Sequence, residues 1–308
     1  YSRALRISEK LHLMSSIART LDNIGGIYAQ KGEYDQALDH FSRALKISEE
    51  LGDKVRIGSS LGNIGWHYWG EGEYDQALDY FNRTLEIWEE LGSKSGIAES
   101  LGSIGGVYWG KGDLGQALNY HSRALAINEE SGNKSGIAGS LGNIGVCYID
   151  MGKYDQALNY HSRALAINEE FDNNKSIGIS FSKIGIYYYF EEKYEKAIEY
   201  LEKSIHIHQE MGYKFFELHT ATHLYLAYKQ LGKDYNEQEI HRIIKEEKNI
   251  ILFEVNFGLY ELLEDKSFLE TAYNQIQQKA DDMEDELKEK FLNYPTPRQI
   301  VEEWEGVS

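Results

Sequence analysis

Apolar residues along this chain recur at helical spacing. Between residues 61 and 90 they form two stripes separated by a short glycine-containing break. The first stripe contains Leu61, Ile64, Gly65 and Tyr68, at positions i, i+3, i+4 and i+7. The second contains Tyr74, Ala77, Leu78, Phe81, Leu85 and Trp88. Residues at these spacings share one face of an α-helix, so the pattern predicts two helices, which end near residues 70–72 and at Gly92.

The two-helix pattern repeats every 40 residues. Leu-Gly-Asn-Ile-Gly occurs at 61–65 and 141–145, and Leu-Gly-Ser-Ile-Gly occurs at 101–105. Aligning these segments produces a glycine column, Gly25, Gly65, Gly105, Gly145 and Gly185, and a tyrosine column, Tyr28, Tyr68, Tyr108, Tyr148, Tyr188 and Tyr228. A single hairpin of this kind cannot bury its apolar stripes alone, so the repeats must stack. The sequence therefore predicts an all-α solenoid of antiparallel helix pairs.

The repeat register predicts a division of the chain at residue 232. Residues 1–232 form an array: a partial first repeat at 1–12, about five 40-residue repeats, and the first helix of a sixth. Tyr1 aligns with Phe41, so the array opens in the middle of a repeat, and we expect the chain to be part of a longer polypeptide.

Residues 233–308 lose the repeat register and predict a divergent helical capping segment. Helices are expected at 237–248, 253–264 and 268–283, and a short final helix is expected at 298–305, after Pro295 and Pro297 end regular structure. A cap with a polar outer face would close the solenoid. The alternative is a docking surface for a neighbouring domain.

The residues of the repeat resemble the tetratricopeptide repeat. The positions that match its signature spacing are Leu61, Ile64, Gly65, Tyr68, Ala77, Phe81 and Thr84. Leu61 stands where that family prefers tryptophan, and Glu89 stands where its second helix usually ends in proline. The 40-residue form is similar to Leu-Gly-Asn-repeat adaptors, kinesin light chains and bacterial sensor arrays. The resemblance implies a right-handed superhelix that binds a peptide or helix in its concave groove.

Charge and cysteine content narrow the choice of partner and compartment. The net charge is −18, which disfavours nucleic acid and favours a hydrophobic or basic protein segment as the partner. The single cysteine, Cys147, excludes an internal disulfide, favours a reducing, cytoplasmic compartment, and is expected to be a buried packing residue. No apolar stretch approaches the roughly 18 residues of a membrane span, so no membrane partner is expected.

A second stripe lies about 110° around the first helix of each repeat from the core stripe. Its large members are Trp66, Trp69, Trp109, Ile149, Ile186 and Tyr189. The family resemblance implies that these positions line the groove, where tryptophan and tyrosine are typical anchors of binding energy. The alternative is that each tryptophan covers the next repeat, with Trp69 lying over Gly102 and Gly106.

One polar column accompanies this stripe. It contains Asn23, Asn63, Ser103 and Asn143. An asparagine side chain offers both a donor and an acceptor, so the column predicts hydrogen bonds to an extended peptide backbone. The alternative interpretation is ordinary asparagine on a helix surface.

Motifs of catalysis and metal binding do not emerge from the sequence. His121 and His161 lie one repeat apart in the column of Phe41 and Phe81, so we interpret them as packed core histidines. The glycines recur within predicted helices and form no phosphate-binding loop. We expect no cofactor, no metal and no enzyme activity. Three hypotheses remain: a peptide-binding scaffold, a regulatory domain attached to a kinase, cyclase or protease outside this chain, and self-association.

Overall fold

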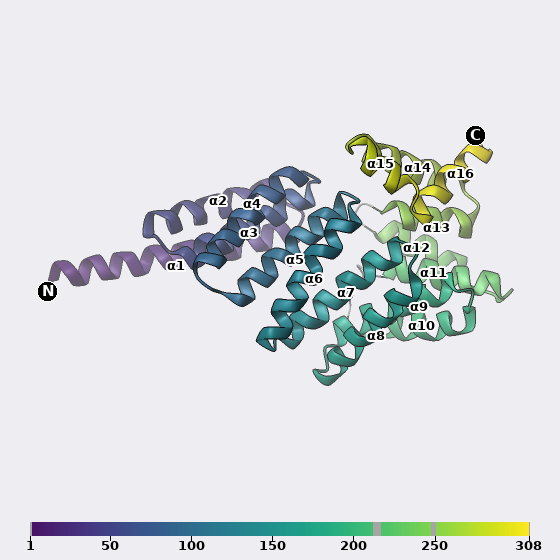
Figure 1. Ribbon diagram of the computed structural model, residues 1–308, viewed down its shortest axis with the longest axis horizontal. Coiled ribbons are helices and arrows are strands. Elements are labelled where there is room, and N and C mark those ends of the chain that lie inside the picture. The colour runs from purple at the N-terminus through teal and green to yellow at the C-terminus, as the bar shows by residue number, and fades with distance from the viewer. Residues whose placement is uncertain (1, 212–216, 248–250, 308) are drawn as a thin grey trace. The chain divides into compact units, whose positions relative to one another are not determined.

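The computed structural model describes residues 2–211, 217–247 and 251–307, and in these ranges every regular element is an α-helix (Figure 1). The predicted all-α array of helix pairs is confirmed. The helices form two compact units, which are described separately. Unit 1 contains the described residues up to 111 together with 115–136, and unit 2 contains 112–114 and the described residues from 137 onward. The predicted division at residue 232 belongs to the sequence pattern and stays a prediction.

Unit 1 is built from three helical hairpins. Its helices are α1 (Ser2–Gln30), α2 (Tyr34–Leu51), α3 (Lys54–Gly70), α4 (Tyr74–Glu90), α5 (Lys94–Gly110) and α6 (Leu114–Ser131). The odd-numbered helices are the first helices of the repeats and the even-numbered ones are the second. Most of them are 17 or 18 residues long, and short turns join them.

Left-handed residues set the length of these helices. Positive φ angles recur every 20 residues from Gly32 to Glu192, at Gly32, Gly52, Gly72, Gly92, Gly112, Gly132, Gly152, Asp172 and Glu192, and another falls at Gly232, 40 residues further on. Glycine adopts this conformation without steric cost, so each turn reverses the chain after a fixed number of helical residues. The 40-residue period is therefore two half-repeats of equal length.

The first helix departs from the prediction. A partial repeat at 1–12 was expected to end before a new helix began, yet α1 runs unbroken from Ser2 to Gln30. His12 occupies the column in which Gly52 and Gly92 take positive φ angles. The non-glycine residue Asp172 turns in the same column, whereas at His12 the helix continues through the position where later repeats turn.

Close approach of paired helices explains the glycine column. A Cβ atom on Gly65 would lie 2.7 Å from the Phe81 ring of α4, and one on Gly105 would lie 2.7 Å from the His121 ring of α6. Beside each glycine, the tyrosine column stacks on a ring of the second helix, as in Tyr68 on Tyr80 with centroids 5.4 Å apart. These contacts fix the register within each hairpin.

Unit 2 continues the array and adds the C-terminal helices. Its repeat helices are α7 (Lys134–Asp150), α8 (Tyr154–Glu170), α9 (Asn174–Phe190), α10 (Tyr194–Glu210) and α11 (Glu217–Gln230). They are followed by α12 (Glu237–Glu246), α13 (Phe253–Leu263), α14 (Lys266–Asp281), α15 (Asp285–Leu292) and α16 (Pro295–Val307). Cys147 is fully buried on α7, which confirms its interpretation as a packing residue.

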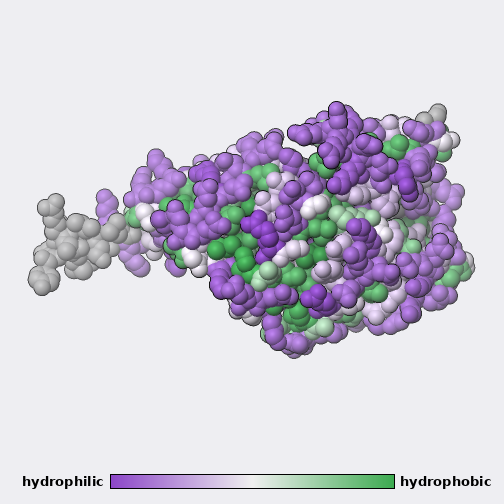
Figure 2. Space-filling model, viewed as in Figure 1, coloured by the Kyte–Doolittle hydropathy of each residue, from purple (hydrophilic) through white to green (hydrophobic). Residues whose placement is uncertain are grey.

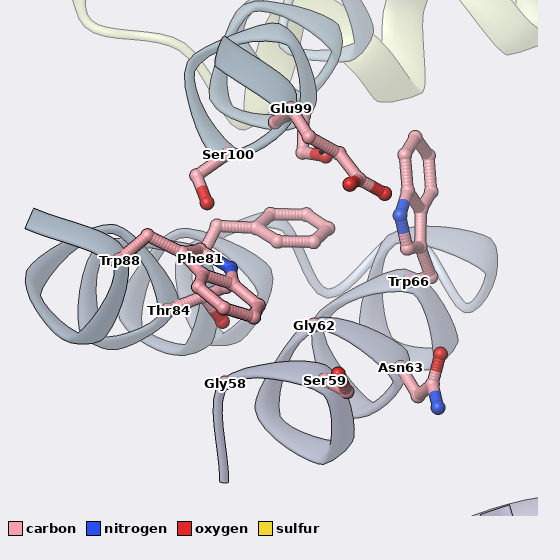
Figure 3. A pocket seen from close by; sticks show the side chains of 11 residues that line it. Gly58, Ser59, Gly62, Asn63, Trp66, Phe81, Thr84, Trp88, Glu99 and Ser100 are labelled. Atoms are coloured by element: carbon pink, nitrogen blue, oxygen red, sulfur yellow. Dashed lines mark hydrogen bonds between the residues drawn. The ribbon is translucent and has the colours of Figure 1, made fainter. Parts of the chain in front are cut away.

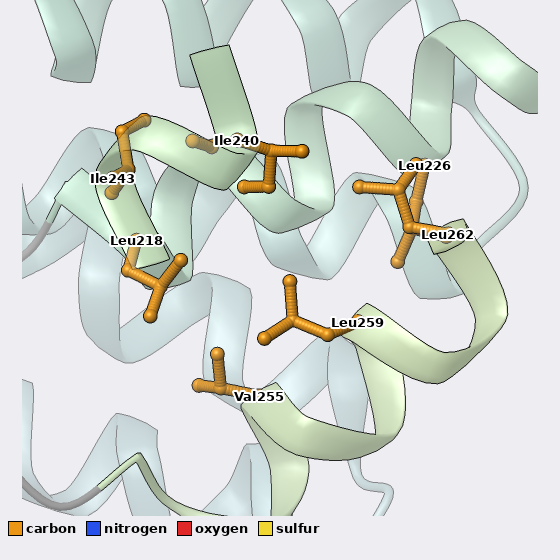
Figure 4. Close-up of a cluster of buried hydrophobic side chains, with 8 residues drawn as sticks. Leu218, Leu226, Ile240, Ile243, Val255, Leu259 and Leu262 are labelled. Atoms are coloured by element: carbon orange, nitrogen blue, oxygen red, sulfur yellow. The ribbon is translucent and has the colours of Figure 1, made fainter. Parts of the chain in front are cut away.

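The C-terminal helices share two apolar clusters. One joins α11, α12 and α13 through Leu218, Leu226, Ile240, Ile243, Val255, Leu259 and Leu262 (Figure 4). The other joins α13 to α14, α15 and α16 and includes Leu269, Ile276, Phe291 and Ile300. The final helix starts at Pro295 rather than at residue 298, because proline fits the first turn of a helix, where its missing N–H costs nothing.

The end of the chain packs against two turns of unit 2. A Cβ atom on Gly112 would lie 2.7 Å from the Met283 side chain, and a Cβ atom on Gly152 would lie 2.6 Å from the Pro295 ring. These residues are separated by more than 140 positions in the sequence, so the C-terminal helices fold back on earlier repeats. The capping role of this segment stays a prediction.

Candidate binding surface

A pocket opens between the first helices of two consecutive repeats in unit 1 (Figure 3). Helices α3 and α5 form its walls and α4 forms its floor. Its lining residues are Gly58, Ser59, Gly62, Asn63, Trp66, Phe81, Thr84, Trp88, Glu99, Ser100 and Ser103. The cavity measures about 240 Å³, which is the scale of one or two side chains rather than of a whole small-molecule ligand.

Small residues on the first helices create this space. A Cβ atom added to Gly62 of α3 would meet only the Thr84 side chain, at 3.8 Å. Ideal Cβ atoms on Gly26, Gly102 and Gly106 would meet nothing within 4 Å. The glycines of the second stripe therefore face open space in unit 1, whereas those of the core column face rings.

The two tryptophans of α3 behave differently. Trp69 is partly buried, and its Nε1–H donates a hydrogen bond to the Gly106 carbonyl at 3.4 Å, so it contacts the next repeat. Trp66 is 46% exposed at the rim of the pocket, with its ring 5.4 Å from that of Phe81. Trp69 thus follows the self-packing interpretation, while Trp66 presents its ring to the pocket. Trp109 on α5 is partly buried.

The asparagine column is partly engaged within unit 1. Asn63 lines the pocket and hydrogen-bonds the carboxyl group of Asp22, which also accepts from Ser60 Oγ at 3.0 and 3.1 Å. Burial raises the pKa of Asp22, and these two hydrogen bonds oppose the rise. Asn23 is exposed on α1, and Ser103 donates to the Glu99 carbonyl at 3.1 Å. Asn63 therefore holds the preceding repeat as well as facing the pocket.

The predicted groove residues of unit 2 are less available. Ile186 is only 2% exposed and packs with Leu201 and Leu224, so it presents no surface to a ligand. Ile186 was predicted to line the groove, but apolar residues of α10 and α11 cover it. Ile149 is partly buried, and Asn143 is exposed on α7.

Tyr189 stands in an aromatic group rather than on an open face. Its ring lies 5.8 Å from Tyr194, 5.6 Å from Phe190 and 5.6 Å from His223. Burial raises the pKa of its phenol, and the nearby Glu261 carboxylate adds to that rise.

Unit 2 contains a charged cluster that the sequence reasoning missed. Its members come from α7, α9, α11, α13 and α14 and are Asp150, Lys183, His219, His223, Glu254 and Lys279. Burial lowers the pKa of Lys183, while Asp150 and Glu254 oppose the shift. A signal was available, because Lys183 and His223 stand at 40-residue steps from Asn143, in the asparagine column.

Glu254 is an acid of this cluster whose pKa is strongly raised. Burial raises its pKa to about 7, and the neighbouring Asp150 carboxylate acts in the same direction. Its Oε2 atom is buried without a hydrogen-bond partner among the residues that the structure describes. A carboxyl group in such surroundings holds its proton to near-neutral pH.

The histidines of the phenylalanine column are core residues. His121 is 3% exposed and His161 is 2% exposed, and burial lowers their pKa values to about 4 and about 3. Within residues 2–211, 217–247 and 251–307, no three histidine, cysteine or acidic side chains come together as a metal site would require. The helices of this same part include none with the length and apolar character to cross a membrane.

Comparisons with known proteins agree on the repeat type. The family model for the tetratricopeptide repeat matches residues 16–90, 67–130 and 136–210, which together exceed half of the chain. A search of functionally characterised proteins found no match.

Several solved structures are similar to this chain. A Rap protein complexed with competence and sporulation factor is 18% identical, with a TM-score of 0.64, over 97% of this chain and 78% of that one. The Rap conjugation gene regulator of plasmid pLS20, in complex with the Phr* peptide, is 15% identical, with a TM-score of 0.62, over 92% and 74%. A signal transduction ATPase with a tetratricopeptide repeat sensor from Pyrococcus horikoshii is 17% identical, with a TM-score of 0.61, over 96% and 43%. At these identities the likeness establishes the fold.

Proposed function

Because the chain belongs to the tetratricopeptide repeat family, we propose that it binds a peptide or a helix of a partner protein against the first helices of its repeats. The observation that carries this proposal is Trp66, a large aromatic side chain left 46% exposed beside a pocket between α3 and α5. Aromatic anchors that fill or flank pockets supply most of the binding energy in protein interfaces.

The surface around the pocket supports the same function. Three glycines of the second stripe, Gly26, Gly102 and Gly106, leave open space beside the first helices of unit 1. Figure 2 shows a largely hydrophilic surface on which hydrophobic residues emerge in patches. A backbone segment of a partner can approach closely where side chains are absent, and Asn63 and Trp66 flank that approach.

The similar Rap proteins add support at the level of ligand type. One was solved with competence and sporulation factor and the other with the Phr* peptide. Shared fold does not transfer a ligand, so the proposal for this chain rests on its own pocket.

Selection from a library of displayed random dodecapeptides tests the proposal. The wild-type protein is expected to enrich related peptides, and Trp66→Ala is expected to lose at least tenfold in affinity for them, about 1.4 kcal/mol or more. Phe171→Ala is the matched control, since Phe171 is an exposed aromatic residue outside the pocket. Enriched peptides that bind Trp66→Ala as tightly as the wild type would contradict the proposed site, and failure to enrich any peptide would contradict the function.

A second candidate function is that of a sensor domain within a larger regulatory protein. The observation that favours it is the likeness to the signal transduction ATPase, of which this chain spans 43%. The complete coding sequence tests it directly. An ATPase, kinase, cyclase or protease domain encoded in the same reading frame would support the sensor role, and a reading frame without one would refute it.

A further inference from the structure

One charged side chain stands in a pocket that is otherwise neutral. Among the described residues that line it, Glu99 alone carries a charge. Figure 3 shows its carboxylate, on α5, pointing toward the Trp66 indole ring, on α3. The pocket therefore places an anion beside an aromatic ring, across the gap between two repeats.

The cations of the neighbouring helices are already paired with other carboxylates. Lys54 Nζ lies 2.6 Å from Glu90, and Lys94 Nζ lies 2.7 Å from Glu130. Arg56 Nε lies 3.1 Å from the carboxylate of Asp53, the N-cap residue of α3. Among the described residues no ion pair involves Glu99 and no hydrogen bond reaches its carboxylate, since the Ser103 hydroxyl donates to the Glu99 backbone carbonyl instead. The carboxylate of Glu99 is thus available to a partner.

The pocket also offers apolar surface beneath the anion. The Phe81 ring forms the floor next to Trp66, and the two rings meet edge to face, with centroids 5.4 Å apart. Thr84 and Ser100 add small polar groups whose hydroxyls already donate to backbone carbonyls, at 2.9 Å in each case. The cavity thus combines a neutral, partly apolar base with one negative charge at its rim.

We propose that this pocket receives one arginine side chain of the partner, which the Trp66 ring stacks against and the Glu99 carboxylate pairs with. The proposal rests on the proposed function and names the side chain that occupies its site. Arginine fits better than lysine, because its planar guanidinium stacks on an indole and presents a fork of donors to a carboxylate, while its aliphatic stem packs on Phe81. The net charge of −18 attracts a basic segment at long range.

A titration of the full chain with small probes tests the pocket without a known partner. The tryptophan indole N–H resonances are followed by ¹⁵N NMR, and Trp66→Phe assigns the Trp66 signal. N-acetyl-arginine amide is the probe, and N-acetyl-citrulline amide, which has the same shape without the charge, is the matched comparison. The Trp66 resonance is expected to shift with arginine at least about fivefold more than with citrulline at equal concentration.

The variant Glu99→Gln and the lysine probe complete the test. Glu99→Gln is expected to weaken the arginine response about fivefold, and N-acetyl-lysine amide is expected to bind more weakly than the arginine probe. An equal response to citrulline, an unchanged response in Glu99→Gln, a stronger response to lysine, or no shift of Trp66 at all would each overturn the proposal.

The peptide selection separates failure of this inference from failure of the proposed function. Selected peptides are expected to carry arginine at one position, and Glu99→Lys is expected to exchange that preference for an acidic residue. Peptides that bind through Trp66 but lack a basic position would leave the proposed function standing while refuting the arginine pocket.

Discussion

Two glycines on the same helix are expected to respond to alanine in opposite directions. Gly102 and Gly105 both lie within α5. A Cβ atom on Gly102 would meet nothing within 4 Å, whereas one on Gly105 would lie 2.7 Å from the His121 ring. The first position belongs to the proposed binding face, and the second belongs to the contact between paired helices.

The magnitudes follow from helix propensity and packing. Alanine is favoured over glycine in a helix interior by about 0.8–1.0 kcal/mol, so Gly102→Ala should stabilise by about that amount. Gly105→Ala gains the same propensity, but it forces a buried ring to move, and overpacking of this kind costs about 1–3 kcal/mol. His121 is 3% exposed and has little freedom to yield, so Gly105→Ala should be destabilising by about 1–2 kcal/mol overall.

Equilibrium denaturation followed by circular dichroism, together with native-state hydrogen exchange of α5, measures both variants. The exchange measurement is included because repeat arrays open locally and depart from two-state unfolding. The expected difference between the variants is about 2–3 kcal/mol. If Gly102→Ala were as destabilising as Gly105→Ala, the second-stripe face of α5 would be filled, and the argument for an open groove would fail.

Four further predictions concern other parts of the fold. Gly102→Trp should occupy the open face and abolish peptide binding while the circular dichroism spectrum is retained; unchanged affinity would place the ligand elsewhere. Trp69→Phe removes the hydrogen bond to the Gly106 carbonyl and should cost about 1 kcal/mol in denaturation, with peptide affinity unaltered. His161→Phe should be more stabilising at about pH 5.5 than at about pH 8, by roughly 1.4 kcal/mol, because burial lowers the folded-state pKa of His161 to about 3. The unfolded state, whose histidine pKa is near 6.5, therefore binds more protons than the folded state in this range, and wild-type stability decreases as the pH is lowered. Equal stabilisation at both pH values would contradict that burial effect. Glu254→Gln should be stabilising above pH 7 and nearly neutral below pH 4.5 in the same assay. The folded protein holds the Glu254 proton up to about pH 7, whereas the unfolded chain releases it near pH 4.5. A larger stabilisation below pH 4.5 than above pH 7 would exclude a buried, protonated Glu254.

The columns of the sequence predict the hairpin well, because each column has one physical role. Gly65 faces Phe81 and Tyr68 stacks on Tyr80, so the residues that repeat are those that touch within a repeat. The positions of most turns were equally predictable, since positive φ angles fall mainly on the glycines between the helices. Local contacts of this kind leave a periodic trace in one sequence.

Departures from the period were harder to interpret. The unbroken α1 passes through His12, in the column where Gly52, Gly92 and Asp172 take positive φ angles, and the register alone does not predict that this position stays helical. Ile186 looked like a groove residue by its column, but it is buried with Leu201 and Leu224 of the following helices. Contacts between repeats depend on the neighbour at each step, and no single column contains that information.

The contacts of the charged cluster of unit 2 could not be predicted from the repeat pattern either. Lys183 and His223 continue the asparagine column, but Glu254, which acts on Lys183, and Lys279, which acts on Glu254, come from helices outside the repeat register. A pattern of 40 residues cannot predict contacts made by a segment that lacks the period. The pocket at Trp66 was partly predictable, because Trp66 lies in the second stripe and Asn63 in the asparagine column, while Glu99 belongs to neither.

Hydrogen–deuterium exchange on the complex with a selected peptide tests the central claim most directly. The account predicts that the bound peptide slows exchange in α3 and α5, around residues 58–69 and 96–109, which carry the pocket and the open glycines. Helices α14, α15 and α16 should exchange at unchanged rates. Protection confined to those C-terminal helices, with α3 and α5 unaffected, would show that the ligand binds elsewhere and would contradict the claim that the first helices form the binding surface.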